Sequence, residues 1–166
     1  MKNIVLIGMP ACGKSTLGVV LAKTLGRGFI DTDLIIQQQQ KRLLQDIINN
    51  DGLEHFLDCE RDAILSAVCE NCVIATGGSA VFREEAMLHL KENGTLVFID
   101  TPVDVLEKRL SNIKTRGIAA SKNKTVAEIY AQRLPLYKKY ADIILETEGE
   151  NIEKSVERLI EMLNEQ

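Results

Sequence analysis

Long apolar runs are absent from this 166-residue sequence. No stretch approaches the roughly 20 residues that a membrane-spanning helix needs, so the sequence predicts no membrane segment. Met1-Lys2-Asn3 leads straight into a short apolar run, and we therefore expect no signal peptide. With 45% hydrophobic and 27% charged residues, the composition is typical of one soluble globular domain covering residues 1–166.

An excess of positive charge is also missing, since the formal net charge is −4. This balance argues against a surface that binds nucleic acid, and an anionic ligand would have to be held by locally placed cations. The four cysteines do not form the framework of a secreted disulfide-rich protein. Cys69 and Cys72 form a lone C-x-x-C with no second pair, which disfavours a zinc site. We expect a cytoplasmic monomer with no nucleic-acid or membrane partner.

A glycine-rich segment follows the first apolar run. Residues 8–16 fit the pattern G-x-x-x-x-G-K-S-T. In this pattern, backbone N–H groups at a helix N-terminus cradle the phosphates of a nucleotide. Lys14 then reaches the β- and γ-phosphates, and the Ser15 hydroxyl binds Mg²⁺. The predicted nucleotide-binding residues are Gly8, Ala11, Cys12, Gly13, Lys14, Ser15 and Thr16.

Short apolar segments alternate with longer amphipathic ones along the chain. The apolar segments predict strands at Asn3–Ile7, Gly28–Asp31, Cys72–Thr76, Thr95–Asp100 and Asp142–Leu145. The amphipathic segments predict helices at Lys14–Leu25, Asp33–Asn49, Leu53–Cys69, Arg83–Asn93, Val103–Leu110, Val126–Tyr140 and Asn151–Leu163. This alternation predicts an α/β fold, with a parallel sheet that helices cover on both faces.

Polar or glycine-rich residues follow several of the predicted strands, where open α/β sheets bind their ligands. Asp31 and Asp33 project to the same side if the extended conformation continues. Phosphoryl transfer needs one carboxylate near the metal and another that accepts the proton of the attacking hydroxyl, and this pair can supply both. The alternative is that Asp33 only caps a helix. Gly77 and Gly78 either let the backbone approach a ligand closely or form a simple turn.

Two segments interrupt the alternation. The first contains more helix than a crossover needs, and we expect a substrate-binding subdomain at about residues 33–61. The second, about residues 111–124, is rich in lysine, serine, asparagine and glycine, which is typical of a mobile lid. Arg109, Arg116 and Arg133 lie in or near this lid. Each is either an ordinary surface charge or a ligand for phosphate or carboxylate oxygens.

Together these motifs resemble the shikimate kinase family. They occur in the family's order and spacing over nearly the whole chain: the glycine-rich loop, Asp31-Thr32-Asp33, Thr76-Gly77-Gly78, Leu106-x-x-Arg109 and Arg133-x-Pro135-Leu136-Tyr137. The resemblance implies a three-layer P-loop kinase fold of the nucleoside-monophosphate-kinase type. It implies five parallel strands in the order 2-3-1-4-5.

The resemblance also implies the nucleotide-binding roles. Lys14 and the loop amides would hold the phosphates of ATP. Ser15 would bind Mg²⁺, and Asp31 would support the metal through water. Arg109 would pack against adenine, and Arg116 would contact the phosphoryl group in transfer.

For the acceptor, the resemblance implies that Asp33 binds the substrate hydroxyls and acts as the base. Gly77 and Gly78 would lie against the substrate ring, and Arg133 would pair with the substrate carboxylate. The implied activity is ATP-dependent phosphorylation of an alcohol group on a small hydroxylated carboxylic acid. Shikimate is the leading acceptor, giving shikimate 3-phosphate and ADP.

The chain departs from the family pattern most clearly at one position. The family's segment G-E-x-x-F-R-x-x-E aligns with residues 52–60, and Leu57 stands where the family has an arginine that grips the shikimate carboxylate. Loss of a hydrogen bond to a charged group costs about ten- to a hundredfold in affinity. Arg61 lies four residues further along the same helix face, so it either compensates as a substrate ligand or is an ordinary surface arginine.

Other departures leave the phosphoryl-transfer residues in place. The family's lid sequence R-P-L-L becomes Arg116-Gly117-Ile118-Ala119, and three family glycines are replaced, by Ala11, Ser79 and Lys41. The alternatives are therefore a kinase for a different small hydroxy acid or polyol, or a nucleotide-binding regulatory relative. A regulatory relative would be expected to lose Lys14, Asp33 or Arg116, and all three are present. Asn123-Lys124-Thr125-Val126 also lacks the aspartate of the guanine-binding pattern.

Overall fold

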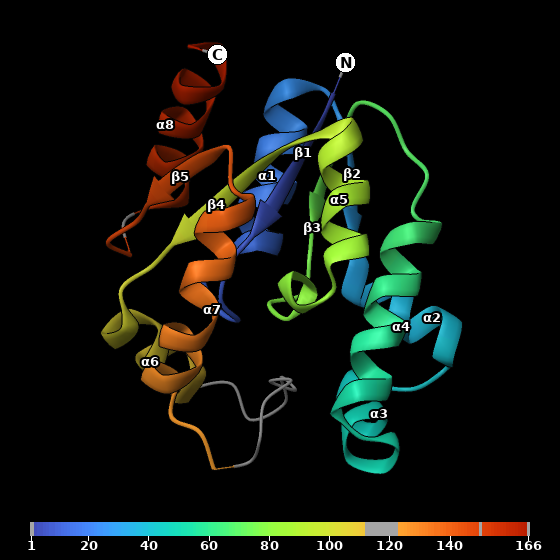
Figure 1. Ribbon diagram of the computed structural model, residues 1–166. Helices are drawn as coiled ribbons and strands as arrows, with labels where there is room; N and C mark the ends of the chain where they lie inside the picture. Colours follow the sequence, from blue (N-terminus) through green and yellow to red (C-terminus); the bar gives the residue numbers. More distant parts are fainter. Residues whose placement is uncertain (1, 112–122, 150, 166) are drawn as a thin grey trace.

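Five parallel strands form one sheet at the centre of the molecule. The computed structural model describes residues 2–111, 123–149 and 151–165. The strands are β1 (Asn3–Ile7), β2 (Gly28–Asp31), β3 (Cys72–Ala75), β4 (Gly94–Asp100) and β5 (Ile143–Glu146). Their order is β2-β3-β1-β4-β5, which confirms the predicted α/β fold and strand order. Because every neighbouring pair is parallel, the carboxyl ends of all five strands lie at the same end of the sheet (Figure 1).

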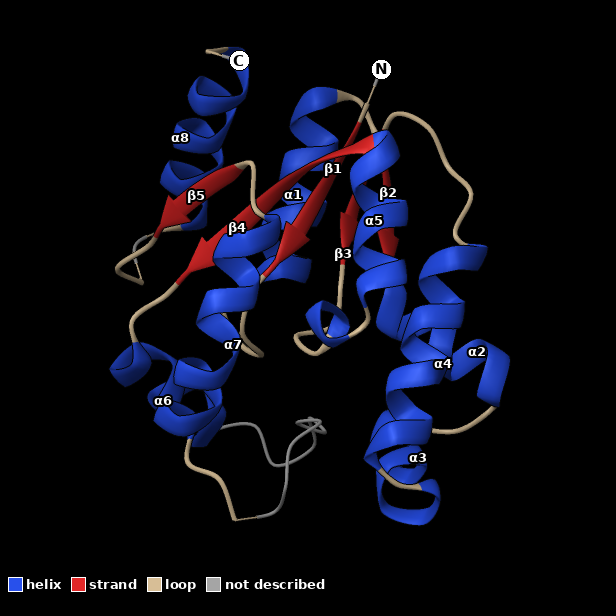
Figure 2. Cartoon of the chain, in the orientation of Figure 1, coloured by secondary structure: helices blue, strands red, loops and turns tan. Residues whose placement is uncertain are grey.

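Helices cover both faces of this sheet. Figure 2 shows α1 (Lys14–Leu25) and α8 (Ile152–Asn164) on one face, and α5 (Glu84–Asn93) and α7 (Val126–Tyr140) on the other. The remaining helices are α2 (Thr32–Gln40), α3 (Leu44–Asp51), α4 (Leu53–Ser66), α6 (Val103–Ser111) and the short 3-10 helix η1 (Ala80–Phe82). In the described ranges, no helix combines the length and the apolar character needed to cross a membrane.

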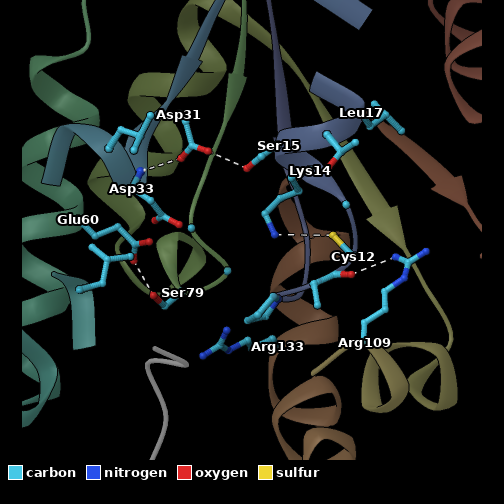
Figure 3. Close-up of a pocket in the computed structure, with 18 of the residues that line it drawn as sticks. Cys12, Lys14, Ser15, Leu17, Asp31, Asp33, Glu60, Ser79, Arg109 and Arg133 are labelled. Atoms are coloured by element: carbon cyan, nitrogen blue, oxygen red, sulfur yellow. Dashed lines mark hydrogen bonds between the residues drawn. The ribbon is translucent and has the colours of Figure 1, made fainter. Parts of the chain in front are cut away.

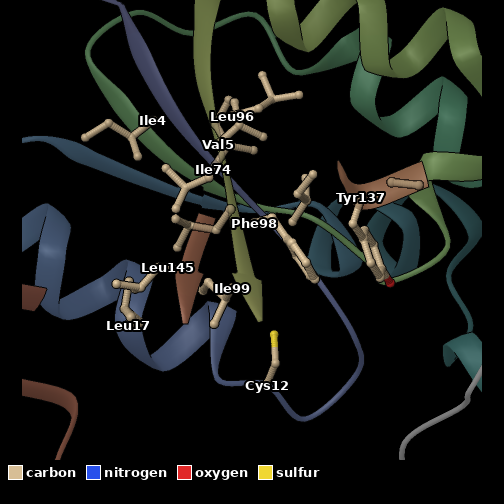
Figure 4. Close-up of a cluster of buried hydrophobic side chains, with 14 of the residues drawn as sticks. Ile4, Val5, Cys12, Leu17, Ile74, Leu96, Phe98, Ile99, Tyr137 and Leu145 are labelled. Carbon is tan, nitrogen blue, oxygen red and sulfur yellow. The ribbon is translucent and has the colours of Figure 1, made fainter. Parts of the chain in front are cut away.

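The main core lies between the sheet and its helices. All five residues of β1 are buried, as expected for a central strand that is covered on both faces. Phe98 of β4 stacks on Tyr137 of α7, with 4.9 Å between the ring centroids (Figure 4). This packing fixes α7 against the sheet near the carboxyl ends of the strands.

Helices α2, α3 and α4 have a small core of their own. Its buried side chains are Ile36, Ile47, Phe56, Leu57, Cys59 and Ala63. Figure 1 shows these helices beyond the β2 edge of the sheet, over about the range predicted for a substrate-binding subdomain. That assignment of function stays a prediction.

The predicted helix Asp33–Asn49 is wrong, because two helices occupy this range. Helix α2 ends at Gln40 and α3 begins at Leu44. Lys41 between them has φ 52°, the left-handed conformation that ends many helices and that glycine adopts most easily. Lys41 keeps the break where the family has a glycine, although a side chain there costs about 1 kcal/mol.

Candidate active site

A cavity of about 810 Å³ lies at the carboxyl end of the sheet. Figure 3 shows its two sides, with Asp33 and Glu60 on one and Lys14 and Arg109 on the other. The predicted site residues that line it are Ala11, Cys12, Gly13, Lys14, Ser15, Thr16, Asp31, Asp33, Gly77, Gly78, Arg109 and Arg133. The structure therefore brings most of the predicted binding residues to one cavity.

The loop between β1 and α1 wraps around the amine of Lys14. Lys14 Nζ donates hydrogen bonds to the carbonyl oxygens of Gly8 and Met9, at 2.8 Å each. Gly13 caps the N-terminus of α1 with φ 97°. Ala11, which stands where the family pattern has a glycine, also has positive φ, at 65°, a conformation that glycine adopts most easily. Loop amides, a helix N-terminus and a buried ammonium together make a site for phosphate.

The end of β2 lies beside the start of α1. Ser15 Oγ donates a hydrogen bond to Asp31 Oδ2 at 2.7 Å, so a hydroxyl and a carboxylate meet at one point. Asp31 Oδ1 accepts a hydrogen bond from the backbone N–H of Asp33 at 3.0 Å and caps α2. The extended conformation therefore stops at Asp31, and Asp31, not Asp33, is the cap. Asp33 nevertheless lines the same cavity from the first turn of α2.

A second carboxyl group lies next to Asp33. A Cβ atom placed on Gly77 would be 3.1 Å from Asp33 Oδ1 and only 2.0 Å from Glu60 Oε1, so both acids approach this glycine closely. Glu60 is 1% exposed, and Ser79 Oγ donates a hydrogen bond to its Oε2 at 2.6 Å. Burial is the main cause that raises the pKa of Glu60 to about 7. Glu60 is not among the site residues predicted from the sequence, although it is the final glutamate of the segment G-E-x-x-F-R-x-x-E.

Arg133 supplies a buried positive charge to the same side of the cavity. It is 1% exposed, and its guanidinium carbon lies 5.4 Å from the centre of the Phe82 ring. A Cβ on Gly78 would lie 2.9 Å from Arg133 Nη1. The Tyr137 hydroxyl donates a hydrogen bond to the Gly78 carbonyl at 2.7 Å and so holds this turn in place.

Arg109 lies at the opposite side of the cavity, near the loop. Its Nη1 donates a hydrogen bond to the Ala11 carbonyl at 3.0 Å. Thr147, Gly149 and Ser155 line the cavity on this side, beyond β5. Most of the predicted lid, at about residues 111–124, lies outside the described residues. Arg116 is among the residues outside them.

Leu57 and Arg61 are not among the residues that line the cavity. Leu57 is 4% exposed and packs in the small core of α2, α3 and α4. The guanidinium of Arg61 is within ion-pair distance of three carboxylates on α4 and α5, those of Asp58, Asp62 and Glu85. The structure therefore does not bring Arg61 to the position of the missing arginine.

The chain is similar to known proteins over nearly its whole length. A family model described as shikimate kinase matches residues 10–164. The chain belongs to the shikimate kinase family. A shikimate kinase from Thermodesulfovibrio yellowstonii is 36% identical over 163 residues, covering 96% of this chain and 94% of its own. One from Persephonella marina is 34% identical over 152 residues, covering 91% of this chain and 92% of its own.

Solved structures agree with this assignment. The chain is similar to a shikimate kinase from Acinetobacter baumannii that was solved in complex with shikimate. The TM-score is 0.93 at 27% identity, over 99% of this chain and 94% of that one. The family and the P-loop kinase fold implied by the resemblance of the motifs are both confirmed. The kinases of this family transfer a phosphoryl group to an alcohol, which is the reaction class predicted from the sequence.

Proposed function

We propose that this protein transfers the γ-phosphoryl group of ATP to a hydroxyl of shikimate. The observation that carries the proposal is the shared cavity, which Asp33, Arg133 and the Lys14 loop all line. A base, a cation and a phosphate site within one cavity are what direct transfer of a phosphoryl group requires. Membership of the shikimate kinase family supports shikimate as the acceptor.

On the nucleotide side, Lys14 and the loop amides bind the β- and γ-phosphates, and Arg109 borders the adenine. Lys14 exchanges the carbonyls of its own loop for phosphate oxygens. Ser15 and Asp31 fit a magnesium ion, since Mg²⁺ takes one or two protein oxygens and completes its shell with phosphates and water. When bound there, the metal neutralises charge on the phosphates.

On the acceptor side, Asp33 accepts the proton of the attacking hydroxyl. Its place in the first turn of α2, fixed by the Asp31 cap, holds it beside Gly77 and in the cavity. Gly77 and Gly78 carry no side chains, so Glu60 and Arg133 approach this turn closely and the acceptor ring lies against its backbone. Arg133 pairs with the acceptor carboxylate, and its burial makes this charge pair stronger than it would be in water.

A second candidate function is phosphorylation of another small hydroxy acid or a polyol. The observation that favours it is Leu57, which replaces a carboxylate-binding arginine of the family pattern and is buried outside the cavity. In the described part of the chain, Arg133 is then the arginine that lines the acceptor side. One arginine fits a monoanionic acceptor, and it binds such an acceptor less tightly than two arginines would.

The test measures ADP release with Mg-ATP and shikimate, beside a panel of small hydroxy acids and polyols. Shikimate should give the highest kcat/KM. Asp33→Asn should lower kcat by about a hundredfold or more while ATP binding stays unchanged, because only the base is removed. Asp46→Asn, on the exposed surface of α3, is the matched control and should keep full activity. A polyol or another acid that outperforms shikimate would establish the second candidate, and full activity of Asp33→Asn would refute the role of Asp33.

A further inference from the structure

Glu60 is a buried acid whose surroundings differ from those that the family pattern predicts. In F-R-x-x-E the arginine lies three residues before the glutamate, on the same side of the helix. Here that position is Leu57, which packs into an apolar core and brings no charge to Glu60. The carboxyl group is held instead by Ser79, itself a replacement for a family glycine. Glu60 Oε1 has no hydrogen-bond partner in the part of the chain that the structure describes.

The charged groups that act on Glu60 come from three other elements. Asp33 of α2 disfavours its ionised form, whereas Arg133 of α7 and Lys14 of α1 favour it. Several charged side chains of the adjoining helices α3 and α5 form ion pairs elsewhere: Asp51 with Arg42, Glu84 with Lys139, Glu85 with Arg61, and Lys91 with Asp142. Burial outweighs the two cations, so Glu60 changes its charge near neutral pH rather than in acid.

We propose that Glu60 takes up a proton when an anionic acceptor binds beside Arg133. The inference rests on the proposed function, because it takes Arg133 as the partner of the acceptor carboxylate. That carboxylate brings another negative charge into a cavity that already holds Asp33, and a nearby like charge favours protonation of a buried acid. Protonated Glu60 no longer opposes the acceptor's charge, and Arg133 is left to attract it. Protonation of Glu60 thus removes a negative charge near the acceptor carboxylate, and this partly replaces the positive charge of the missing arginine.

Ser79 allows this change without losing its contact. A hydroxyl can donate to a carboxylate and can also accept from a protonated acid. The Glu60–Ser79 pair can therefore persist in both states. Ser79 is in this sense a positioning residue: its hydrogen bond stabilises the ionised form and sets the pH at which Glu60 takes up its proton.

The measurable consequence is a proton linked to acceptor binding. A rise of about one unit in the pKa of Glu60 on binding corresponds to uptake of about half a proton per acceptor near pH 7.5. The same rise weakens acceptor binding by about five- to tenfold between about pH 6 and pH 8.5. If the role of Glu60 were purely structural, acceptor binding would take up no proton at Glu60, and its affinity would not vary with pH in this range.

Isothermal titration calorimetry with shikimate, in buffers of different ionisation enthalpy, counts these protons. Wild type should take up protons near neutral pH, and Glu60→Gln should take up none and bind with little dependence on pH. Ser79→Ala should move the uptake to higher pH, because it loses the hydrogen bond that favours the carboxylate. Glu161→Gln, exposed on α8, is the matched control and should behave as wild type. Absence of uptake in wild type, or its persistence in Glu60→Gln, would overturn the inference.

A second measurement separates this inference from the proposed function. The ¹³C carboxyl resonance of Glu60, assigned by its loss in Glu60→Gln, gives the pKa of this group without any ligand. Titration near pH 7 supports the inference even if shikimate is not phosphorylated, a result that would refute shikimate as the acceptor. Titration near the ordinary value of 4.5 overturns the inference even if shikimate is a good substrate.

Discussion

Replacement of Glu60 by glutamine should stabilise the protein at alkaline pH and alter its stability far less in acid. Burial raises the pKa of Glu60 from 4.5 to about 7, so the folded protein keeps this proton up to about pH 7. The unfolded chain releases the same proton near pH 4.5. Protonation therefore favours the folded state over this interval, and the contribution of Glu60 to stability is lost as the pH rises through it.

The size of the effect follows from the two pKa values. At about 1.4 kcal/mol per unit, full ionisation of Glu60 costs the folded state about 3 kcal/mol relative to the unfolded chain. At about pH 5 most of the folded protein is still protonated, and the cost is below about 1 kcal/mol. Glutamine keeps an oxygen that accepts the hydrogen bond from Ser79 and carries no charge at any pH. It removes the ionisation cost and keeps the contact.

Urea unfolding of wild type and Glu60→Gln at about pH 5 and about pH 8 measures this difference. The variant should gain up to about 3 kcal/mol relative to wild type at the higher pH and less than about 1 kcal/mol at the lower. Glu161→Gln should show no such dependence, since its side chain is exposed on α8. An equal change in the free energy of unfolding at both pH values would show that Glu60 ionises normally in the folded protein.

Four further substitutions test other parts of the protein. Arg133→Ala should raise the KM for the acceptor about tenfold or more and the KM for ATP far less. Arg61→Ala should leave both KM values unchanged. Steady-state kinetics in which Arg133→Ala affects both substrates equally would contradict its role as the partner of the acceptor carboxylate. Lys41→Gly should stabilise the protein by about 1 kcal/mol, because glycine relieves the left-handed conformation at φ 52°, and a lowered urea midpoint would contradict this. Gly77→Ala should weaken acceptor binding and lower stability by about 1–3 kcal/mol, because its Cβ would lie 2.0 Å from Glu60 Oε1; an unchanged acceptor KM would show that the two groups can move apart.

Much of the fold could be predicted from local patterns. Strands β1 and β2 have the bounds predicted for them, and the other three differ by one residue at one or both ends. Each strand coincides with a short apolar run, the local sequence pattern that is typical of a buried parallel strand. The strand order, unlike the strand positions, could not be predicted from local patterns. It followed from the resemblance of the motifs to a family, and no periodicity in the sequence contains it.

The errors occurred where tertiary contacts decide the conformation or the direction of a side chain. Lys41 ends a helix without any of the residues that usually signal an end, so the break before α3 was missed. Arg61 shares a helix face with Leu57, but carboxylates on α4 and α5 draw it away from the cavity. The importance of Glu60 depends on burial against Ser79 and Gly77, which are distant in sequence.

The two sides of the cavity have different origins in the chain. Residues 10–17 form one continuous segment around the phosphate site, whereas helices α2, α3 and α4 bring a separate core of their own to the other side. Natural variation or laboratory selection can therefore alter which compound is phosphorylated without disturbing the machinery that handles ATP. Leu57, which stands where the family pattern has an arginine, lies in this separate core. For engineering, this makes α2–α4 the part of the protein in which to seek new acceptors.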